Sequence, residues 1–250
     1  VRSMVGLIPI FAVEVIEPEL LKRLPRFKEY LDWVLKNRPK LASLVSRWNE
    51  PGRGHRHLFS LLREDRLRSL LRRMMDEEEF LSPYGIRSMS KAHEKDPFIL
   101  KCNGRTKYCN GHSQVDYQPA ESNSYMFGGN SNWRGPIWFP VNFLLIESLQ
   151  RFHHYYGNDF KLESPTNSGE KMTLEAISED IAGRLGDLFR KNSNGIRPIY
   201  LHHPKLQSDD RFSDYIWFYE YFHGDNGRGV GACHQTGWTA LIAKLLQPRV

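Results

Sequence analysis

The residue types best suited to chemistry gather in three segments of the second half of the chain. The first leads into a predicted helix and carries two indoles, Trp133 and Trp138. Indole faces cover the C–H patches of a sugar ring, and Arg134, Asn132 and Asn142 can hydrogen-bond its hydroxyl groups. The alternative is that both Trp residues belong to the core and the neighbouring glycines only shape the helix entry. The combination of Gly, Asn, Trp and Arg favours a binding site.

The second segment places a carboxylate, Glu220, inside a run of aromatic residues. Aromatic neighbours exclude water, and a partly desolvated carboxylate suits general-base work on a water molecule near neutral pH. An ion pair between Glu220 and Arg134 or Arg228 is an equally good interpretation of the sequence. The glycines that follow do not indicate a nucleotide-binding loop, because no strand leads into them and no Lys-Ser/Thr pair comes after them.

The third segment opens the last predicted helix, which runs to Leu246. Gln235 and Trp238 are candidates to line a pocket, and Thr236 is the expected N-cap of the helix. A capped closing helix with a core tryptophan explains Trp238 equally well.

Hydrophobic spacing predicts that helices position these segments. The stretch after Pro136 is apolar nearly all round, which indicates burial on most sides, whereas the stretch after Thr173 has one apolar stripe. Alternation of buried and one-sided helices indicates two concentric helical layers. The predicted helices cover 17–37 with a break at Pro25, 41–45, 61–80, 136–156, 173–191 and a last one ending at Leu246.

Two further patterns bear on the architecture. Residues 81–136 have little periodicity, but their many aromatic side chains argue for an ordered segment rather than a disordered linker. A weak four-residue repeat begins at Val1, Ile86 and Ile196. Repeats are typical of repetitive architectures, although matches this short can arise by chance.

Composition sets the remaining limits. The 250 residues carry a net charge of +6, but acids are interspersed with bases between Lys22 and Arg73, so we expect solvated helix faces and no nucleic-acid binding. We expect no metal, since Cys102, Cys109 and Cys233 lack ligand spacing and the paired histidines are adjacent in sequence. Because no apolar run can span a membrane and no signal peptide is recognised, we expect a cytoplasmic protein without a membrane partner.

At these segments the chain resembles glycoside hydrolase family 63, particularly the branch near mannosylglycerate hydrolases and α-glucosidases. The matching strings are residues 130–138 with Asn142, residues 218–222 with Gly231, and residues 235–238. The family fold is an (α/α)6 toroid of six helical hairpins. The resemblance therefore implies an all-α protein with inner and outer helical layers joined by long loops.

The resemblance also implies roles in an inverting glycosidase. Glu220 would be the general base that activates water, and Trp133 and Trp138 would line the sugar subsite. Gln235 would bind the sugar, while Arg134 would either touch the sugar or orient Glu220. The substrate implied is an α-linked glucoside or a small glycosylated solute, and the reaction needs no metal or organic cofactor.

One part of the family pattern has no counterpart in this sequence. The general acid of the family is an Asp in a Gly- and Asp-rich loop, and Asp116, Asp210 and Asp214 lack that context. Inversion needs two carboxyl groups roughly 6.5–9.5 Å apart. We therefore expect residues 1–250 to form a single domain, the C-terminal portion of a catalytic toroid whose missing N-terminal half supplies the acid. We expect little or no activity from the isolated chain.

Two other classes of protein stay open at this point. The first is a non-catalytic, carbohydrate-binding helical protein that has the aromatic pocket but no turnover. The second is a basic helical domain that binds nucleic acid, for which steeply salt-dependent binding would be the signature.

Overall fold

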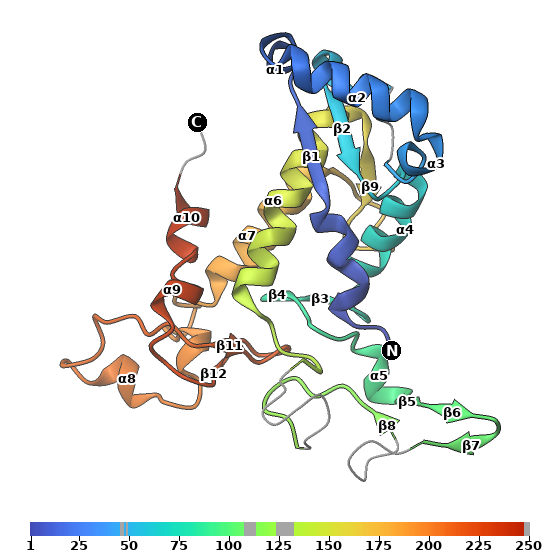
Figure 1. The fold of residues 1–250 in the computed structure, drawn as a ribbon. Helices are drawn as coiled ribbons and strands as arrows, with labels where there is room; N and C mark the ends of the chain where they lie inside the picture. Colours follow the sequence, from blue (N-terminus) through green and yellow to red (C-terminus); the bar gives the residue numbers. More distant parts are fainter. Residues whose placement is uncertain (46–47, 49, 108–113, 124–132, 248–250) are drawn as a thin grey trace. The chain divides into compact units, whose positions relative to one another are not determined.

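The computed structural model describes residues 1–45, 48, 50–107, 114–123 and 133–247 (Figure 1). Contacts divide the chain into two compact units. The first unit consists of Val1–Gly6, Arg73–Phe143 and Glu179–Val250, and the second of Leu7–Arg72 and Leu144–Ser178. Within the described ranges, no helix is both long enough and apolar enough to cross a lipid bilayer.

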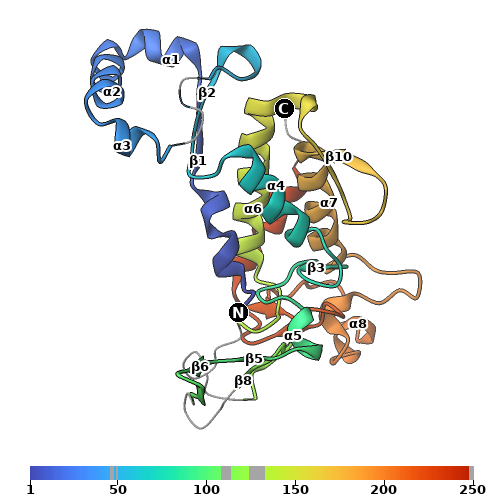
Figure 2. The ribbon, with the colours of Figure 1, turned by 90° about the vertical axis from the view of Figure 1, so that its right-hand side faces the viewer.

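The second unit combines helices with two antiparallel strand pairs. Strand β1 (Val13–Ile16) pairs with β2 (His57–Ser60), and β9 (Lys161–Glu163) pairs with β10 (Lys171–Thr173). Figure 2 shows three helices of this unit, α1, α2 and α3, following one another beside β1 and β2. Helical elements wholly or partly in this unit are η1 (Met4–Phe11), α1 (Pro18–Arg23), α2 (Pro25–Asn37), α3 (Pro39–Ala42), η2 (Arg53–His55), α4 (Glu64–Met74), α6 (Phe139–Tyr156), η3 (Gly157–Asp159) and α7 (Leu174–Asp187).

Helix α2 follows the predicted period without the burial that such a period usually brings. Helix α1 ends at Arg23 and α2 begins at Pro25, so the predicted break is confirmed. Phe27 and Tyr30 lie on the apolar face, yet their exposed fractions are 42% and 65%. No residue of α2 is buried. Periodicity determines that this segment is a helix, but burial depends on what packs against its face.

The first unit contains short antiparallel strand pairs and short helices. Its strand pairs are β3 (Leu81–Ser82) with β4 (Gly85–Ile86), β5 (Phe98–Ile99) with β8 (Gln114–Val115), β6 (Lys101–Cys102) with β7 (Arg105–Thr106), and β11 (Tyr221–Phe222) with β12 (Gly229–Val230). Its helices are α5 (Ala92–Lys95), η4 (Pro198–Tyr200), α8 (Lys205–Ser208), α9 (Thr236–Thr239) and α10 (Ile242–Leu246), together with parts of η1, α4, α6 and α7.

The predicted long helices are present but shorter than expected. Helix α4 ends at Met74 because the Asp76 carboxylate accepts the backbone N–H of Glu78 (2.9 Å) and stabilises a turn there. Helix α7 ends at Asp187, followed by a turn in which the Phe189 N–H donates to the Gly186 carbonyl (3.0 Å). The predicted apolar stripe is confirmed, since four members in α7 and one just after it are fully buried: Leu174, Ile177, Ile181, Leu185 and Leu188.

The segment between β3 and α6 is ordered where the structure describes it, as its aromatic content predicts. Tyr117, for example, is only 5% exposed. Three other aromatic residues behind that prediction, Tyr108, Tyr125 and Phe127, lie outside the described residues, as do Cys109 and Asn132.

The first two copies of the weak repeat pair with each other. Ser3 forms an antiparallel bridge with Met89, and the Met4 N–H donates to the Ser88 carbonyl (2.8 Å). The repeat is therefore associated with a real contact inside the first unit. Helices are the longest elements of the described residues, and the closure of an (α/α)6 toroid stays a prediction.

Candidate active site

Three segments that are far apart in sequence meet through the backbone of Ile137. Ile137 bridges Arg87 on one side and Phe222 on the other, both in antiparallel fashion. The Ile137 N–H donates to the Phe222 carbonyl (2.9 Å), and the Phe222 N–H donates back to Ile137 (3.0 Å). This small ladder lies within the first unit. It brings the Trp-rich segment beside the segment that carries Glu220.

Gly135 lets the Trp-rich segment turn into the ladder. Its φ is +155°, and a Cβ at this position would lie 2.6 Å from the Tyr117 ring and 2.7 Å from the Gln118 carbonyl oxygen. Its N–H donates to the Ser88 hydroxyl (3.0 Å). A side chain cannot be accommodated there without moving the backbone, so glycine is needed for the approach.

Asn142 fixes the start of α6 from within the core. Its Oδ1 accepts the Ile86 N–H (2.7 Å), while its Nδ2 donates to the carbonyls of Ile86 (3.1 Å) and Trp138 (3.0 Å). The side chain is fully buried. The expectation that Asn142 hydrogen-bonds a sugar is therefore wrong, because its amide is already used to hold α6 against β4.

An aromatic wall stands beside the ladder. Trp138 stacks on Trp133 (ring centroids 4.3 Å apart, 9° between planes) and on Tyr221 (5.0 Å, 22°), and it meets Trp238 edge-on (6.1 Å). Trp138 is 6% exposed and belongs to a core cluster with Tyr221 and Val230. Trp133 and Trp238 are 40% and 38% exposed. Solvent thus reaches the outer two indoles, while Trp138 supports them.

Glu220 lies at the base of the β11–β12 hairpin, next to this wall. Its N–H donates to the Ala232 carbonyl (2.8 Å), and its Oε2 accepts the Ala232 N–H (3.3 Å). The Trp238 indole N–H donates to the Glu220 carbonyl (3.0 Å), which ties the exposed indole to the base of the hairpin. Gly231 opposite has φ +74°, and a Cβ there would lie 2.6 Å from Oε2. The carboxylate is half-buried.

The two arginines considered as partners of Glu220 pair with other carboxylates. Arg134 lies 3.1 Å from Asp116 (Nη1 to Oδ1), and Arg228 lies 2.7 Å from Glu121 (Nη2 to Oε2). Arginine pairing therefore does not account for the position of Glu220.

Arg134 is a buried organiser of the segment before the wall. Its guanidinium also bonds Gln118, Ser122 (3.1 Å) and Asn123 (3.0 Å), and the residue is 2% exposed. Burial lowers the pKa of Arg134, and the charge of Asp116 partly opposes that shift. Both Nη atoms are engaged with residues 116–123, which this arrangement holds against the turn at Gly135.

Gln235 precedes the short helix α9 and is its N-cap position. Its carbonyl accepts the N–H groups of Trp238 (3.0 Å) and Thr239 (2.9 Å), and its own N–H donates to Phe218 (2.8 Å). The Gln235 side chain makes no capping bond. The prediction of Thr236 as N-cap is wrong, because Thr236 is already the first helical residue.

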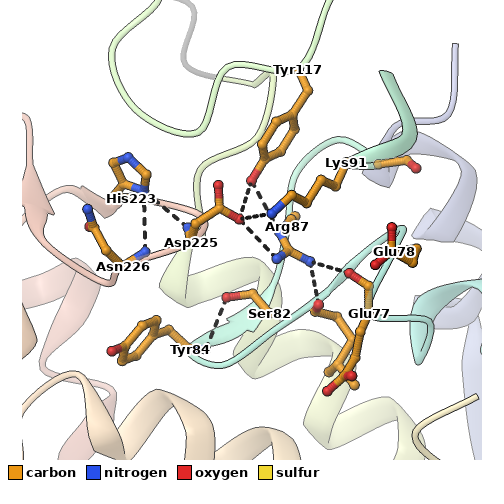
Figure 3. Close-up of polar contacts among 12 residues, drawn as sticks. Glu77, Glu78, Ser82, Tyr84, Arg87, Lys91, Tyr117, His223, Asp225 and Asn226 are labelled. Atoms are coloured by element: carbon orange, nitrogen blue, oxygen red, sulfur yellow. Dashed lines mark hydrogen bonds and ion pairs between the residues drawn. The ribbon is translucent and has the colours of Figure 1, made fainter. Parts of the chain in front are cut away.

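Sequence reasoning missed a buried polar cluster behind the hairpin (Figure 3). Arg87, 3% exposed, pairs with Asp225 (Nη2 to Oδ1, 3.0 Å) and donates to the Tyr117 hydroxyl (3.1 Å). Lys91 reaches the same Asp225 oxygen (3.3 Å). The available signal was the position of Arg87 in the weak repeat and of Asp225 in the glycine-rich stretch.

The electrostatics of this cluster are set by burial and by its two cations. Burial acts to raise the pKa of Asp225, but Arg87 and Lys91 outweigh it and lower the pKa below the ordinary value. Burial, together with the Asp225 charge, raises the pKa of Tyr117, so its hydroxyl stays protonated. Burial lowers the pKa of His223.

One sizeable hollow does not contain the candidate site. It measures about 950 Å³, lies in the second unit, and has Trp48, Arg63 and Arg68 among its lining residues. We place the candidate site where Glu220, the indoles and the ladder lie close together. The size of a hollow by itself does not indicate a reaction. Within the described ranges, no group of three or more His, Cys, Asp or Glu side chains has the arrangement of a metal site.

Comparison with known proteins gives one domain family and several relatives. The pattern of the mannosylglycerate hydrolase MGH1-like glycoside hydrolase domain matches residues 57–239. An uncharacterised protein of Saccharomyces cerevisiae is 50% identical over 247 residues, which are 98% of this chain and 22% of that protein. A probable mannosyl-oligosaccharide glucosidase of Schizosaccharomyces pombe and the mannosyl-oligosaccharide glucosidase of Saccharomyces cerevisiae are each 25% identical over 182 residues, 72% of this chain and 15% of each relative. The chain thus spans about a fifth or less of the length of these relatives.

Proposed function

Since this chain belongs to the MGH1-like glycoside hydrolase domain family, within glycoside hydrolase family 63, we propose that it is the C-terminal part of the catalytic toroid of an inverting glycosidase. The substrate is an α-linked glucoside or a small glycosylated solute. The relatives named as glucosidases support the choice of sugar. An N-terminal part of the same enzyme is the partner that completes the site.

Glu220 is the general base in this proposal. It removes a proton from the water that attacks the anomeric carbon, while a second carboxyl group protonates the departing oxygen. The observation that carries this role is the placement of a half-buried carboxylate at the base of β11, held by the Ala232 N–H (3.3 Å) beside a wall of indoles. The Ala232 N–H binds Oε2, and among the described residues no hydrogen bond is made to Oε1, which is the oxygen that contacts water in this proposal.

The aromatic wall binds the sugar in this proposal. Trp133 and Trp238 offer the exposed indole surface, and Trp138 supports it by stacking on Trp133. Gln235, half-buried before α9, supplies a polar side chain for a hydroxyl group. Arg134 supports the sugar site indirectly, because its guanidinium holds residues 116–123 against the turn that carries Trp133.

The general acid is an Asp outside this chain. Of the acids singled out from the sequence, Asp116 is paired with Arg134 at 3.1 Å. One carboxylate cannot both activate water and protonate the leaving oxygen on the opposite face of the bond. The isolated 250 residues are therefore expected to be inactive on unactivated glycosides. The chemistry needs two carboxyl groups and water, so it requires neither a metal nor an organic cofactor.

The test uses the full-length protein and 4-nitrophenyl α-D-glucopyranoside. Glu220→Gln is expected to lower kcat by about 10²–10⁴-fold, the usual range for loss of a general base. Glu179→Gln, on the exposed side of α7, is the matched control and should leave kcat unchanged. The first product anomer, followed by NMR, should be β. Full activity of Glu220→Gln, or α-glucose as the first product, would contradict the proposal.

A non-catalytic carbohydrate-binding protein is the rival outcome. The aromatic wall is complete within this chain, and that observation alone would suit a binder. Calorimetric titration of glucose oligosaccharides decides between the two. Equal affinity of wild type and Glu220→Gln, with no turnover by the full-length protein, would favour the binder.

A further inference from the structure

We propose that the ion pair between the buried Arg87 and Asp225 sets the position of the Glu220 carboxylate, which makes Asp225 a positioning residue for the reaction. This inference rests on the function proposed above. It adds a residue that acts on neither the substrate nor the attacking water directly, but through the hairpin that both acidic residues share.

The first step of the argument is that Arg87 is a fixed point. Its guanidinium donates to the backbone carbonyls of Leu81 and Glu77 (3.3 Å) and to the hydroxyl of Tyr117 (3.1 Å). The residue is 3% exposed, and its backbone is bridged to Ile137. A guanidinium held by so many acceptors on different segments has little freedom to move, so whatever it binds is fixed with it.

The second step is that Asp225 is the contact between this fixed point and the hairpin. It lies in the loop between β11 and β12. Its Oδ1 accepts hydrogen bonds from Arg87 (3.0 Å), Lys91 (3.3 Å) and the Tyr117 hydroxyl (3.1 Å). The loop is internally tight. The His223 Nδ1 accepts the Asp225 N–H (3.1 Å). A displacement of the Asp225 carboxylate is therefore expected to move the whole loop with it.

The third step is that the hairpin cannot hold its own geometry. Each of its strands is two residues long, and an isolated two-stranded hairpin is marginal in water. External contacts must fix it. Phe222, the last residue of β11, bonds Ile137 on both sides. In the loop, Asp225 bonds Arg87, the Gly224 N–H donates to the Pro119 carbonyl (2.7 Å), and Arg228 pairs with Glu121 (2.7 Å). Glu220 lies immediately before β11, so loss of the Arg87–Asp225 pair removes the contact that joins its hairpin to the buried guanidinium.

The expected effect follows from the sensitivity of catalysis to position. A displacement of about 1 Å in a catalytic group costs on the order of 100-fold in rate. Trp133 stacks on Trp138, and both residues belong to the segment before α6 and not to the hairpin. Loss of the Arg87–Asp225 pair is thus expected to lower kcat while leaving KM nearly unchanged.

The experiment is a mutant cycle in the full-length protein, again with 4-nitrophenyl α-D-glucopyranoside. Asp225→Asn is expected to lower kcat by about 10–100-fold with KM within about threefold. Asp180→Asn is the control, because it breaks an ion pair of Asp180 with Arg184 (2.8 Å) on α7. The side chains of Asp180 and Asp225 are equally exposed, at 29% and 30%. The control should leave kcat within about twofold of the wild-type value, because a partly exposed ion pair on α7 contributes little energy.

The decisive readout is the same change made in the Glu220→Gln background. If Asp225 acts through Glu220, Asp225→Asn should change the residual rate there by less than about threefold, because coupled residues are not additive. An equal fall in both backgrounds, or an unchanged kcat in Asp225→Asn alone, would overturn the inference. Undiminished activity of Glu220→Gln alone would instead overturn the proposed function.

A milder variant keeps the inference testable if Asp225→Asn does not fold. Two cations contact Asp225, and Lys91, with its side chain 35% exposed, is the more exposed of them. Lys91→Met removes this cation and leaves Arg87 in place. It is expected to lower kcat by about two- to fivefold without a change in KM, in proportion to the weaker contact. No change in kcat of a folded Lys91→Met protein would then count against the inference.

Discussion

Helix α2 and the β11–β12 hairpin represent opposite ways of forming local structure. Helix α2 has thirteen residues with a clear apolar period, yet buries none of them. The hairpin has two residues in each strand, all four buried, and every element that fixes it comes from elsewhere in the sequence. Local periodicity thus forms an element without determining its burial, whereas the candidate site is formed by contacts that no local pattern reveals.

The strongest challenge to this comparison is Gly135→Ala. The added Cβ would lie 2.6 Å from the Tyr117 ring at φ +155°, so we expect a loss of about 3–4 kcal/mol in the free energy of unfolding of the purified chain. Gly183→Ala in α7 is the control. Its Cβ meets nothing within 4 Å, and alanine should stabilise the helix by about 0.5–1 kcal/mol. Urea denaturation measures both, and a neutral Gly135→Ala would show that the turn can relax.

Asn142→Leu tests whether the distant contacts around the ladder are as important as the geometry suggests. The variant removes three buried hydrogen bonds to Ile86 and Trp138, so we expect a loss of about 2–3 kcal/mol. Gln150→Leu, which removes a single long bond to Ser178 (3.4 Å), serves for comparison and should cost less than about 1 kcal/mol. Equal effects of the two variants would contradict a special role for Asn142.

The pH dependence of the free energy of unfolding tests how much the ion pairs of Asp225 contribute to fixing the hairpin. The folded-state pKa of Asp225 is below the ordinary value of 3.8, so its ion pairs contribute stability above that value, and this contribution is lost as the pH falls through the folded pKa. Asp225→Asn should therefore destabilise the chain by about 1–2 kcal/mol at pH 7, after allowance for partial exposure. The difference from wild type should shrink below pH 4. A difference that stays constant down to pH 2 would exclude the ion pair as its cause.

The smallest effect is expected in α2. Tyr30→Ser changes a side chain that is 65% exposed and should alter the free energy of unfolding by less than about 0.5 kcal/mol, apart from its stacking on Trp33. Thermal unfolding followed by circular dichroism is sufficient to measure it. A loss above 1 kcal/mol would mean that the apolar face of α2 is covered in solution, and the contrast with the hairpin would disappear.

The sequence predicts the long elements well because their information is local. The stripe of α7 and the break at Pro25 follow from spacing and from the missing N–H of proline. It also identifies the three segments of the candidate site, and the family resemblance behind them is confirmed by the domain match. The roles given to Glu220 and Gln235 stay predictions.

What the sequence does not predict are the pairings across long separations. Asn142 and Arg134 look like sugar ligands in a linear string, yet the fold uses the first to hold β4 and the second to hold residues 116–123. Arg87 and Asp225 are 138 positions apart, and nothing near either residue specifies the other. Such choices depend on the packing of whole segments, which composition and period do not encode.

The stack of Trp133 on Trp138 has a consequence for how this protein can change over evolutionary time. Only the inner indole is part of the core, whereas the outer one is 40% exposed and contributes little to folding. Under the proposed function, replacement at position 133 would alter which sugar is recognised while the core around Trp138 persists. Diversification of specificity within such proteins is expected to begin at that outermost ring.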